Sequence, residues 1–135
     1  MQRLIIAGGQ VYAPEAQPAD AAILIEEGRI VALAPAASLP ADIPRLDAAG
    51  LIVAPGFIDL QINGGFGHDF TADSASIAAV AARLPASGVT GFLPTIVTAP
   101  LERRRAALEA AGDVVTGGAH VLGLHFEGPY INPAR

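Results

Sequence analysis

The stretch FIDLQINGG, residues 57–65, decides how the fold is read. Apolar and polar residues alternate from Ile58 to Asn63, which is the period of a β-strand, and two glycines end the run. Outward from it, the patterns predict strands at 89–96 and 120–126, one helix between Asp73 and Gly88, and another at 101–111.

The three strands begin near residues 57, 89 and 120, an interval of about thirty residues that is typical of βαβ units and a parallel sheet. Such units open either a doubly wound sheet or a (β/α)8 barrel, and both fit the pattern. Because a whole barrel needs about 250 residues, the chain would hold less than half of one.

The first 54 residues predict a small β domain. Short apolar runs are separated by glycines and prolines, and Glu26–Gly28 is a hairpin signal between two of them. The predicted strands lie at 4–6, 11–12, 22–25, 29–33, 45–47 and 51–53.

Composition excludes several classes of protein. The 135 residues are 52% apolar and 16% charged, so a buried core is feasible. A net charge of -5, with eight arginines and no lysine, disfavours nucleic acid and anionic membranes as partners. The absence of cysteine excludes disulfides and thiolate metal sites. No apolar run is long enough to span a bilayer and Met1–Gly9 is too short for a signal peptide, so we expect a cytoplasmic protein.

Asp59, Gln61 and Asn63 share one face of the first predicted parallel strand. Such strands are normally apolar on both sides, so this face borders a polar cavity or belongs to an edge strand in water. The opposite face is expected to be buried under helices, and it carries Ile58, Leu60 and Ile62. The glycine-rich loop that follows matches neither a P-loop nor a dinucleotide-binding fingerprint.

The third predicted strand ends in Glu127, where both parallel architectures bind ligands. Alternation places Val121, Gly123 and His125 on the face of Glu127, and the apolar face would carry Leu122, Leu124 and Phe126. Glu127 and His125 therefore indicate a metal ligand with a supporting group, an acid–base pair, or a salt-bridged glutamate beside a core histidine. His68 and His120 are expected to be solvated or structural.

Several motifs together resemble the amidohydrolase superfamily and, within it, the N-acetylglucosamine-6-phosphate deacetylase family. They are LIVAPGFID at 51–59, LQINGG at 60–65, GVT at 88–90, FLPT at 92–95 and GLHFEGPYINP at 123–133. The resemblance implies part of a small β-sandwich domain at 1–54, followed at 55–135 by the first three βα units of a (β/α)8 metal-dependent hydrolase barrel. It covers only the front part of such an enzyme.

The resemblance also assigns site residues. Glu127 matches the glutamate that binds one catalytic divalent metal, zinc or iron, and His125 would support that metal from below. Gln61 and Asn63 replace two histidines of the superfamily. Since amide oxygens are poor ligands for transition metals, these two imply a single-metal site that they face as hydrogen-bonding groups. Gly64 and Asn132 are further candidates for lining the substrate site, as are Tyr130 and Arg135.

The implied activity is metal-assisted hydrolysis of N-acetylglucosamine 6-phosphate to glucosamine 6-phosphate and acetate. The resemblance implies a homodimer acting on this small molecule. The other metal ligands and the catalytic aspartate would lie outside this sequence, so we expect the 135-residue chain to be inactive alone. Two alternatives are a hydrolase of cyclic amides and a non-catalytic assembly module.

Overall fold

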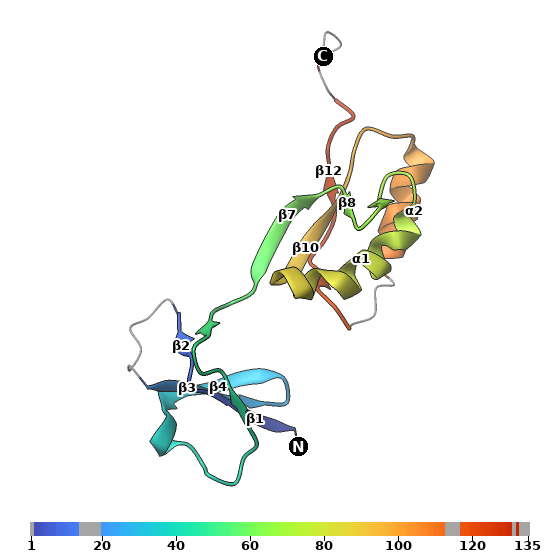
Figure 1. Ribbon diagram of the computed structural model, residues 1–135. Coiled ribbons are helices and arrows are strands. Elements are labelled where there is room, and N and C mark those ends of the chain that lie inside the picture. The colour runs from blue at the N-terminus through green and yellow to red at the C-terminus, as the bar shows by residue number, and fades with distance from the viewer. Residues whose placement is uncertain (1, 14–19, 113–116, 131, 133–135) are drawn as a thin grey trace. The chain divides into compact units, whose positions relative to one another are not determined.

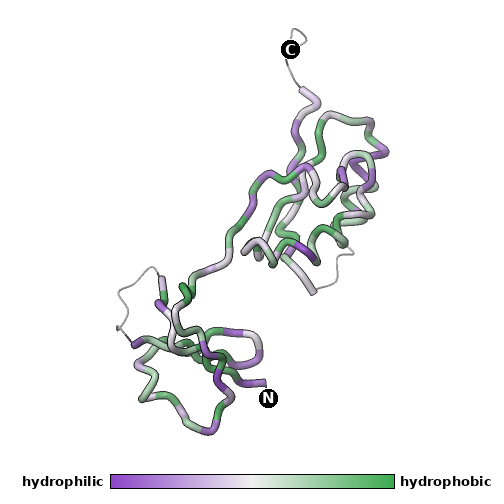
Figure 2. The backbone as a smooth tube through the Cα atoms, viewed as in Figure 1, coloured by the Kyte–Doolittle hydropathy of each residue, from purple (hydrophilic) through white to green (hydrophobic). Residues whose placement is uncertain are grey.

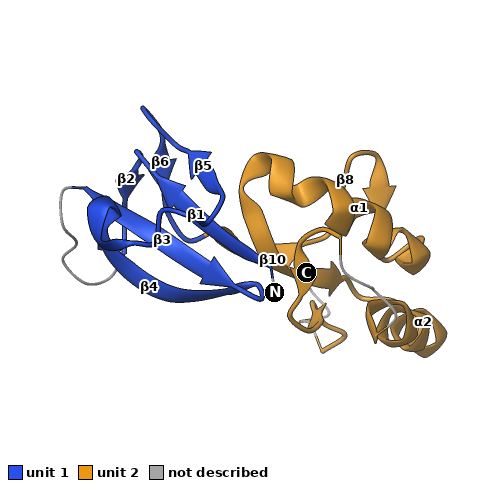
Figure 3. Cartoon of the chain, turned by 90° about the horizontal axis from the view of Figure 1, so that it is seen from below, with its two compact units in different colours: residues 1–55 blue, residues 56–135 orange. Residues whose placement is uncertain are grey.

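The computed structural model describes residues 2–13, 20–112, 117–130 and 132. The chain divides into two compact units, residues 1–55 and residues 56–135, which are blue and orange in Figure 3. Within the described ranges, no helix has the length and apolar character needed to cross a membrane.

The first unit is built mainly of strands. A four-stranded sheet has the order β4-β3-β1-β5, and the short strands β2 and β6 pair separately in parallel. The predicted hairpin is confirmed between β3 and β4, with Glu27 and Gly28 at positive φ in its turn. The strands are β1 Arg3–Ala7, β2 Gln10–Val11, β3 Ala21–Glu26, β4 Arg29–Pro35, β5 Arg45–Asp47 and β6 Ile52–Val53, with a 3₁₀ turn at Ala36–Ser38.

The second unit is α/β, and its three predicted strand regions are parallel. Strand β10 (Val89–Ile96) is central, with β7 (Phe57–Ile62) on one side and the short β11 (His120–Val121) and β12 (His125–Phe126) on the other (Figure 1). The α/β class is therefore confirmed. A small hairpin, β8 (Gly64–Gly65) and β9 (His68–Asp69), follows β7 directly.

Two helices pack on one face of this sheet. They are α1 (Ile77–Arg83), flanked by 3₁₀ turns at Ser74–Ser76 and Leu84–Ser87, and α2 (Leu101–Gly112). The predicted apolar stripe of the first helix is confirmed, because Ile77, Val80, Ala81 and Leu84 are all buried. They join Phe92 and Ile96 of β10 in one core, where each fully buried large side chain contributes about 2 kcal/mol.

The prediction for the apolar face of β7 is wrong in part. Ile62 packs against the core, but Ile58 is 60% exposed and Leu60 is 65% exposed. Figure 2 shows hydrophobic and hydrophilic residues alternating along this strand. Alternation reveals which residues share a face but not whether anything covers it, and among the described residues β7 pairs only with β10.

The prediction for the third strand is also wrong in part, because that strand is interrupted between β11 and β12. Phe92 pairs with Val121 and Thr95 with His125, so the outer strand holds one residue more than β10 over this interval. Such a bulge reverses the faces on either side of it. Val121 therefore packs against the core, whereas Leu122 is 54% exposed.

Candidate active site

Gln61 and Glu127 meet at the carboxyl ends of the parallel strands. Gln61 Nε2 donates a hydrogen bond of 3.4 Å to Glu127 Oε2, joining residues that are 66 positions apart. Both side chains are exposed. The contact forms because β7 and β12 flank β10 in the same direction, which brings their ends to one edge of the sheet.

The backbone of Glu127 is held from β10 and the residues that follow it. Its amide donates to the carbonyl of Ile96 at 2.9 Å, and its carbonyl accepts a hydrogen bond of 3.2 Å from Thr98 Oγ1. The next residue, Gly128, has φ +98°, and a Cβ there would lie 2.2 Å from Thr98 Oγ1. Glycine is therefore required beside this carboxylate, because any side chain would collide with the threonine that holds it.

Gln61 is oriented by a bond within its own strand. Asp59 Oδ1 accepts a hydrogen bond of 3.0 Å from the Gln61 backbone amide. Such local bonds compete with the ladder bonds of a strand, and the register of β7 against β10 is irregular in the same region. Asp59, which the sequence placed on the polar face, thus supports the residue that contacts Glu127.

His125 contacts a residue that sequence reasoning missed. Its Nδ1 lies 3.4 Å from Thr95 Oγ1, and Thr95 is fully buried. No hydrogen bond between the side chains of His125 and Glu127 is found in the described part of the chain. Thr95 lies in the FLPT motif but was given no role, and Thr98 gave no signal in the sequence, because threonine is common in strands and at their ends for packing reasons alone.

Asn63 and Gly64 form the base of the β8–β9 hairpin. The Asn63 carbonyl accepts from the Phe70 amide at 3.0 Å. A Cβ on Gly64 would lie 2.0 Å from the carbonyl oxygen of His68, so the hairpin needs glycine there. The Asn63 side chain is exposed, and no hydrogen bond joins either of these described residues to Glu127.

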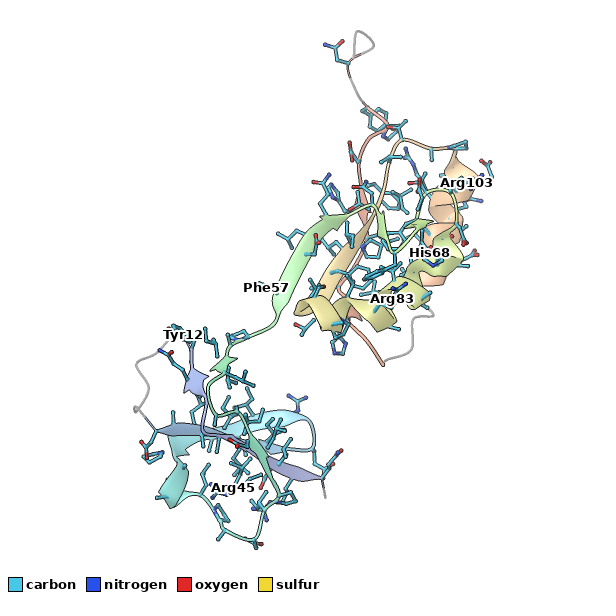
Figure 4. The ribbon with its side chains drawn as sticks, viewed as in Figure 1. Tyr12, Arg45, Phe57, His68, Arg83 and Arg103 are labelled. Carbon is cyan, nitrogen blue, oxygen red and sulfur yellow. The ribbon has the colours of Figure 1, made fainter. Side chains whose placement is uncertain are left out.

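The hairpin contacts α1, and the segment just after it contacts α2. Arg83 of α1 stacks over the ring of Phe66 at 4.1 Å, and Arg103 of α2 donates to the Thr71 carbonyl at 3.3 Å. Figure 4 labels both arginines, together with His68 on the hairpin. The loop after β7 is thus a fixed edge of the site.

The remaining candidates among the described residues are exposed. Tyr130 and Asn132 are exposed and lie outside the strands, and His68 and His120 are exposed as expected. Arg135 lies outside the described residues.

The described residues supply one candidate metal ligand rather than a metal centre. No group of three or more His, Cys, Asp or Glu side chains that could hold a metal ion occurs among them. A catalytic zinc needs about three protein ligands, so Glu127 fits as one ligand of a site that other residues would have to complete.

Comparison with proteins of known structure first shows which fold the chain shares. No family model matches the chain. A D-hydantoinase of known structure superposes on 97% of this chain with a TM-score of 0.58 at 24% identity, which shows a shared fold. The chain therefore shares the fold of this D-hydantoinase over its matched part, and its own carboxylate, Glu127, lies at the carboxyl end of a parallel strand.

The sequence then narrows the resemblance. The chain is 43% identical, over 96% of its length, to the N-acetylglucosamine-6-phosphate deacetylase of Bos taurus, and covers 29% of that protein. The crystal structure of the deacetylase from Pasteurella multocida matches 98% of this chain with a TM-score of 0.89 at 29% identity, and 36% of that chain is covered. The predicted resemblance to N-acetylglucosamine-6-phosphate deacetylases is confirmed, and the chain spans less than a third of the curated relative's length.

Proposed function

We propose that the full-length protein carrying this sequence hydrolyses the acetamide of N-acetylglucosamine 6-phosphate to glucosamine 6-phosphate and acetate. The observation that carries the proposal is the 43% identity to a deacetylase over 96% of the chain. The contact between Glu127 and Gln61, at the edge where parallel α/β sheets bind ligands, supports it. The substrate is then a small amino-sugar phosphate.

The same resemblance supports an architecture. We propose that residues 55–135 are the first three βα units of a (β/α)8 barrel and that residues 1–54 belong to a small β-sandwich domain. The parallel order around β10 supports the first assignment, and the separate sheets of the first unit support the second. A cytoplasmic homodimer is part of the same proposal.

In this function Glu127 is a metal ligand. A bound divalent metal, zinc or iron, would polarise the acetamide carbonyl and lower the pKa of a water molecule. The chain's own contribution is orientation. Gln61 occupies one lone pair of Glu127 Oε2, and Thr98 fixes the carbonyl of the same residue. This leaves the carboxylate preorganised to bind one cation.

Gln61 and Asn63 are hydrogen-bonding groups in this proposal. Amide side chains are much weaker ligands for transition metals than imidazole is. The amide nitrogen of Gln61 points at Glu127 Oε2, which suits a donor that orients a carboxylate. His125, Gly64 and Asn132 complete the proposed surroundings of the site.

The test is turnover by the full-length protein. We expect release of acetate from N-acetylglucosamine 6-phosphate and no opening of hydantoin or dihydroorotate. Glu127→Gln should lower kcat/KM and bound metal by about 100-fold or more, because it removes an anionic ligand. Glu109→Gln, at an exposed position on α2, is the matched control and should retain wild-type values.

Two results would overturn the assignment. Preference for a cyclic amide would move the protein to another activity of the same fold. Absence of any hydrolysis, with a stable monomer of the 135-residue chain in size-exclusion chromatography, would favour an assembly module. The 135-residue chain by itself is expected to show no turnover, because its described residues hold no complete metal centre.

A further inference from the structure

Thr95 is a buried polar residue beneath the site. Its side chain has no exposed surface, and it lies on β10 directly opposite His125 of β12. A buried hydroxyl without a hydrogen bond is destabilising, so its partners matter. Thr95 Oγ1 lies 3.2 Å from the carbonyl oxygen of Leu93 and 3.4 Å from His125 Nδ1.

The number of protons in this cluster fixes their placement. A hydroxyl has one proton to donate, and a carbonyl oxygen can only accept. If Thr95 donates to the carbonyl of Leu93, its hydroxyl oxygen can still accept a hydrogen bond from the Nδ1–H group of His125. This is the arrangement that satisfies both contacts at once.

We propose that Thr95 is a positioning residue that holds His125 in the tautomer protonated at Nδ1, leaving Nε2 as a hydrogen-bond acceptor for the site. His125 is half-buried, and Nε2 has no hydrogen-bond partner among the described residues. Nε2 is not among the buried polar atoms without a hydrogen bond in that part of the chain, so it is accessible to solvent there. The ring of His125 is thus anchored at Nδ1, and its Nε2 is open in the part of the chain that the structure describes.

The consequence for chemistry rests on the proposed function. His125 lies two residues before Glu127, so the anchored ring presents Nε2, with a free lone pair, near the proposed metal ligand. That nitrogen accepts a hydrogen bond from an O–H group, of a bound sugar or of water, and cannot donate one. Without Thr95, the opposite tautomer would present a donor in the same place.

The experiment is ¹⁵N NMR of the full-length protein with labelled histidine at alkaline pH. We expect a protonated-type shift at His125 Nδ1 and an unprotonated-type shift at Nε2. Thr95→Val keeps the side-chain shape and removes the hydroxyl, so the other tautomer should become populated. Thr95→Ser should restore the wild-type shifts.

A second readout links the tautomer to the site. The kcat/KM of Thr95→Val for N-acetylglucosamine 6-phosphate should fall by about 10–100-fold, because a donor would replace the acceptor that faces a bound O–H group, and Thr95→Ser should recover most of it. Thr90→Val is the control, because Thr90 is an exposed threonine on the same strand.

An unprotonated Nδ1 in the wild type would overturn the proposal, and this spectrum is decisive even if Thr95→Val fails to fold. Unchanged shifts in a folded Thr95→Val would overturn it as well. A wild type that shows the expected tautomer but no deacetylase turnover would refute the proposed function alone.

Discussion

Strands β10 and β7 are neighbours in one sheet, yet their surroundings differ sharply. β10 is paired on both sides and most of its residues are buried, whereas among the described residues β7 is paired on one side and exposes Ile58 and Leu60. The two residues that meet in the candidate site come from the less covered strands. Gln61 lies near the end of β7, and Glu127 follows the last residue of β12. The buried core and the exposed residues of the candidate site thus come mainly from different strands, and β10 serves the site by pairing with the other two strands and by placing Thr95 against His125.

The largest expected effect is on β10. Phe92→Ala removes a ring with no exposed surface that packs against Phe70, with centroids 6.4 Å apart. We expect a loss of about 3–5 kcal/mol in the free energy of unfolding, from lost burial and the cavity left behind. Urea denaturation measures it. A loss below about 1 kcal/mol would mean that the core of this unit does not depend on β10.

The second prediction concerns the glycine after Glu127. Gly128→Ala places a Cβ against Thr98 Oγ1 at a positive φ, whereas Gly67→Ala at φ +90° meets no atom within 4 Å. The control should lose about 1–2 kcal/mol from backbone strain alone, and Gly128→Ala should lose more and bind metal more weakly. Urea denaturation of both variants measures the free energy of unfolding, and Zn²⁺ titration of both in the full-length protein measures the metal affinity.

A double variant separates collision from strain in that prediction. Thr98→Ala removes the hydroxyl that the new Cβ would meet, so Gly128→Ala combined with Thr98→Ala should recover the part of the stability lost to the collision. No recovery would show that the close approach of Gly128 and Thr98 is unimportant.

The third prediction concerns the contact between the two outer strands. Gln61→Met keeps the length of the side chain and removes the donor to Glu127 Oε2. We expect Zn²⁺ affinity of the full-length protein to fall by about tenfold, since support of a metal-binding carboxylate is lost. Gln10→Met, at an exposed glutamine in the other unit, should change nothing. Equal affinities for both variants would show that the Gln61 bond does not position Glu127.

The sequence predicted the positions of the strands and helices better than the burial of their faces. Strand and helix periods located β7, β10, α1 and α2, because alternation and helical stripes are local properties. The bulge before His125 was not predictable, since it depends on pairing with β10 and leaves no mark on the residues themselves. The exposure of Ile58 was missed for the same reason, because burial depends on what lies outside the strand.

For the candidate site, too, the sequence predicted individual residues better than the contacts between them. Glu127 and Gln61 were recognisable from motif and strand position, but their bond and the supporting roles of Thr95 and Thr98 arise from residues about 30 or more positions apart in sequence meeting through the parallel register. Such partners carry no individual signal, because a threonine that holds a carbonyl looks like one that only fills space.

The smallest expected effect is on β7. Ile58→Ala in the 135-residue chain should cost no more than about 0.5 kcal/mol, because the side chain is 60% exposed there. Denaturation beside Ile96→Ala, which truncates a buried isoleucine of β10 and should cost about 2–5 kcal/mol, gives the comparison directly. In the full-length protein the cost of Ile58→Ala should rise toward that of Ile96→Ala if further barrel strands cover β7, as the proposed architecture requires. An equally small cost in both forms of the protein would leave β7 as a true edge strand and argue against closure of the barrel on that side.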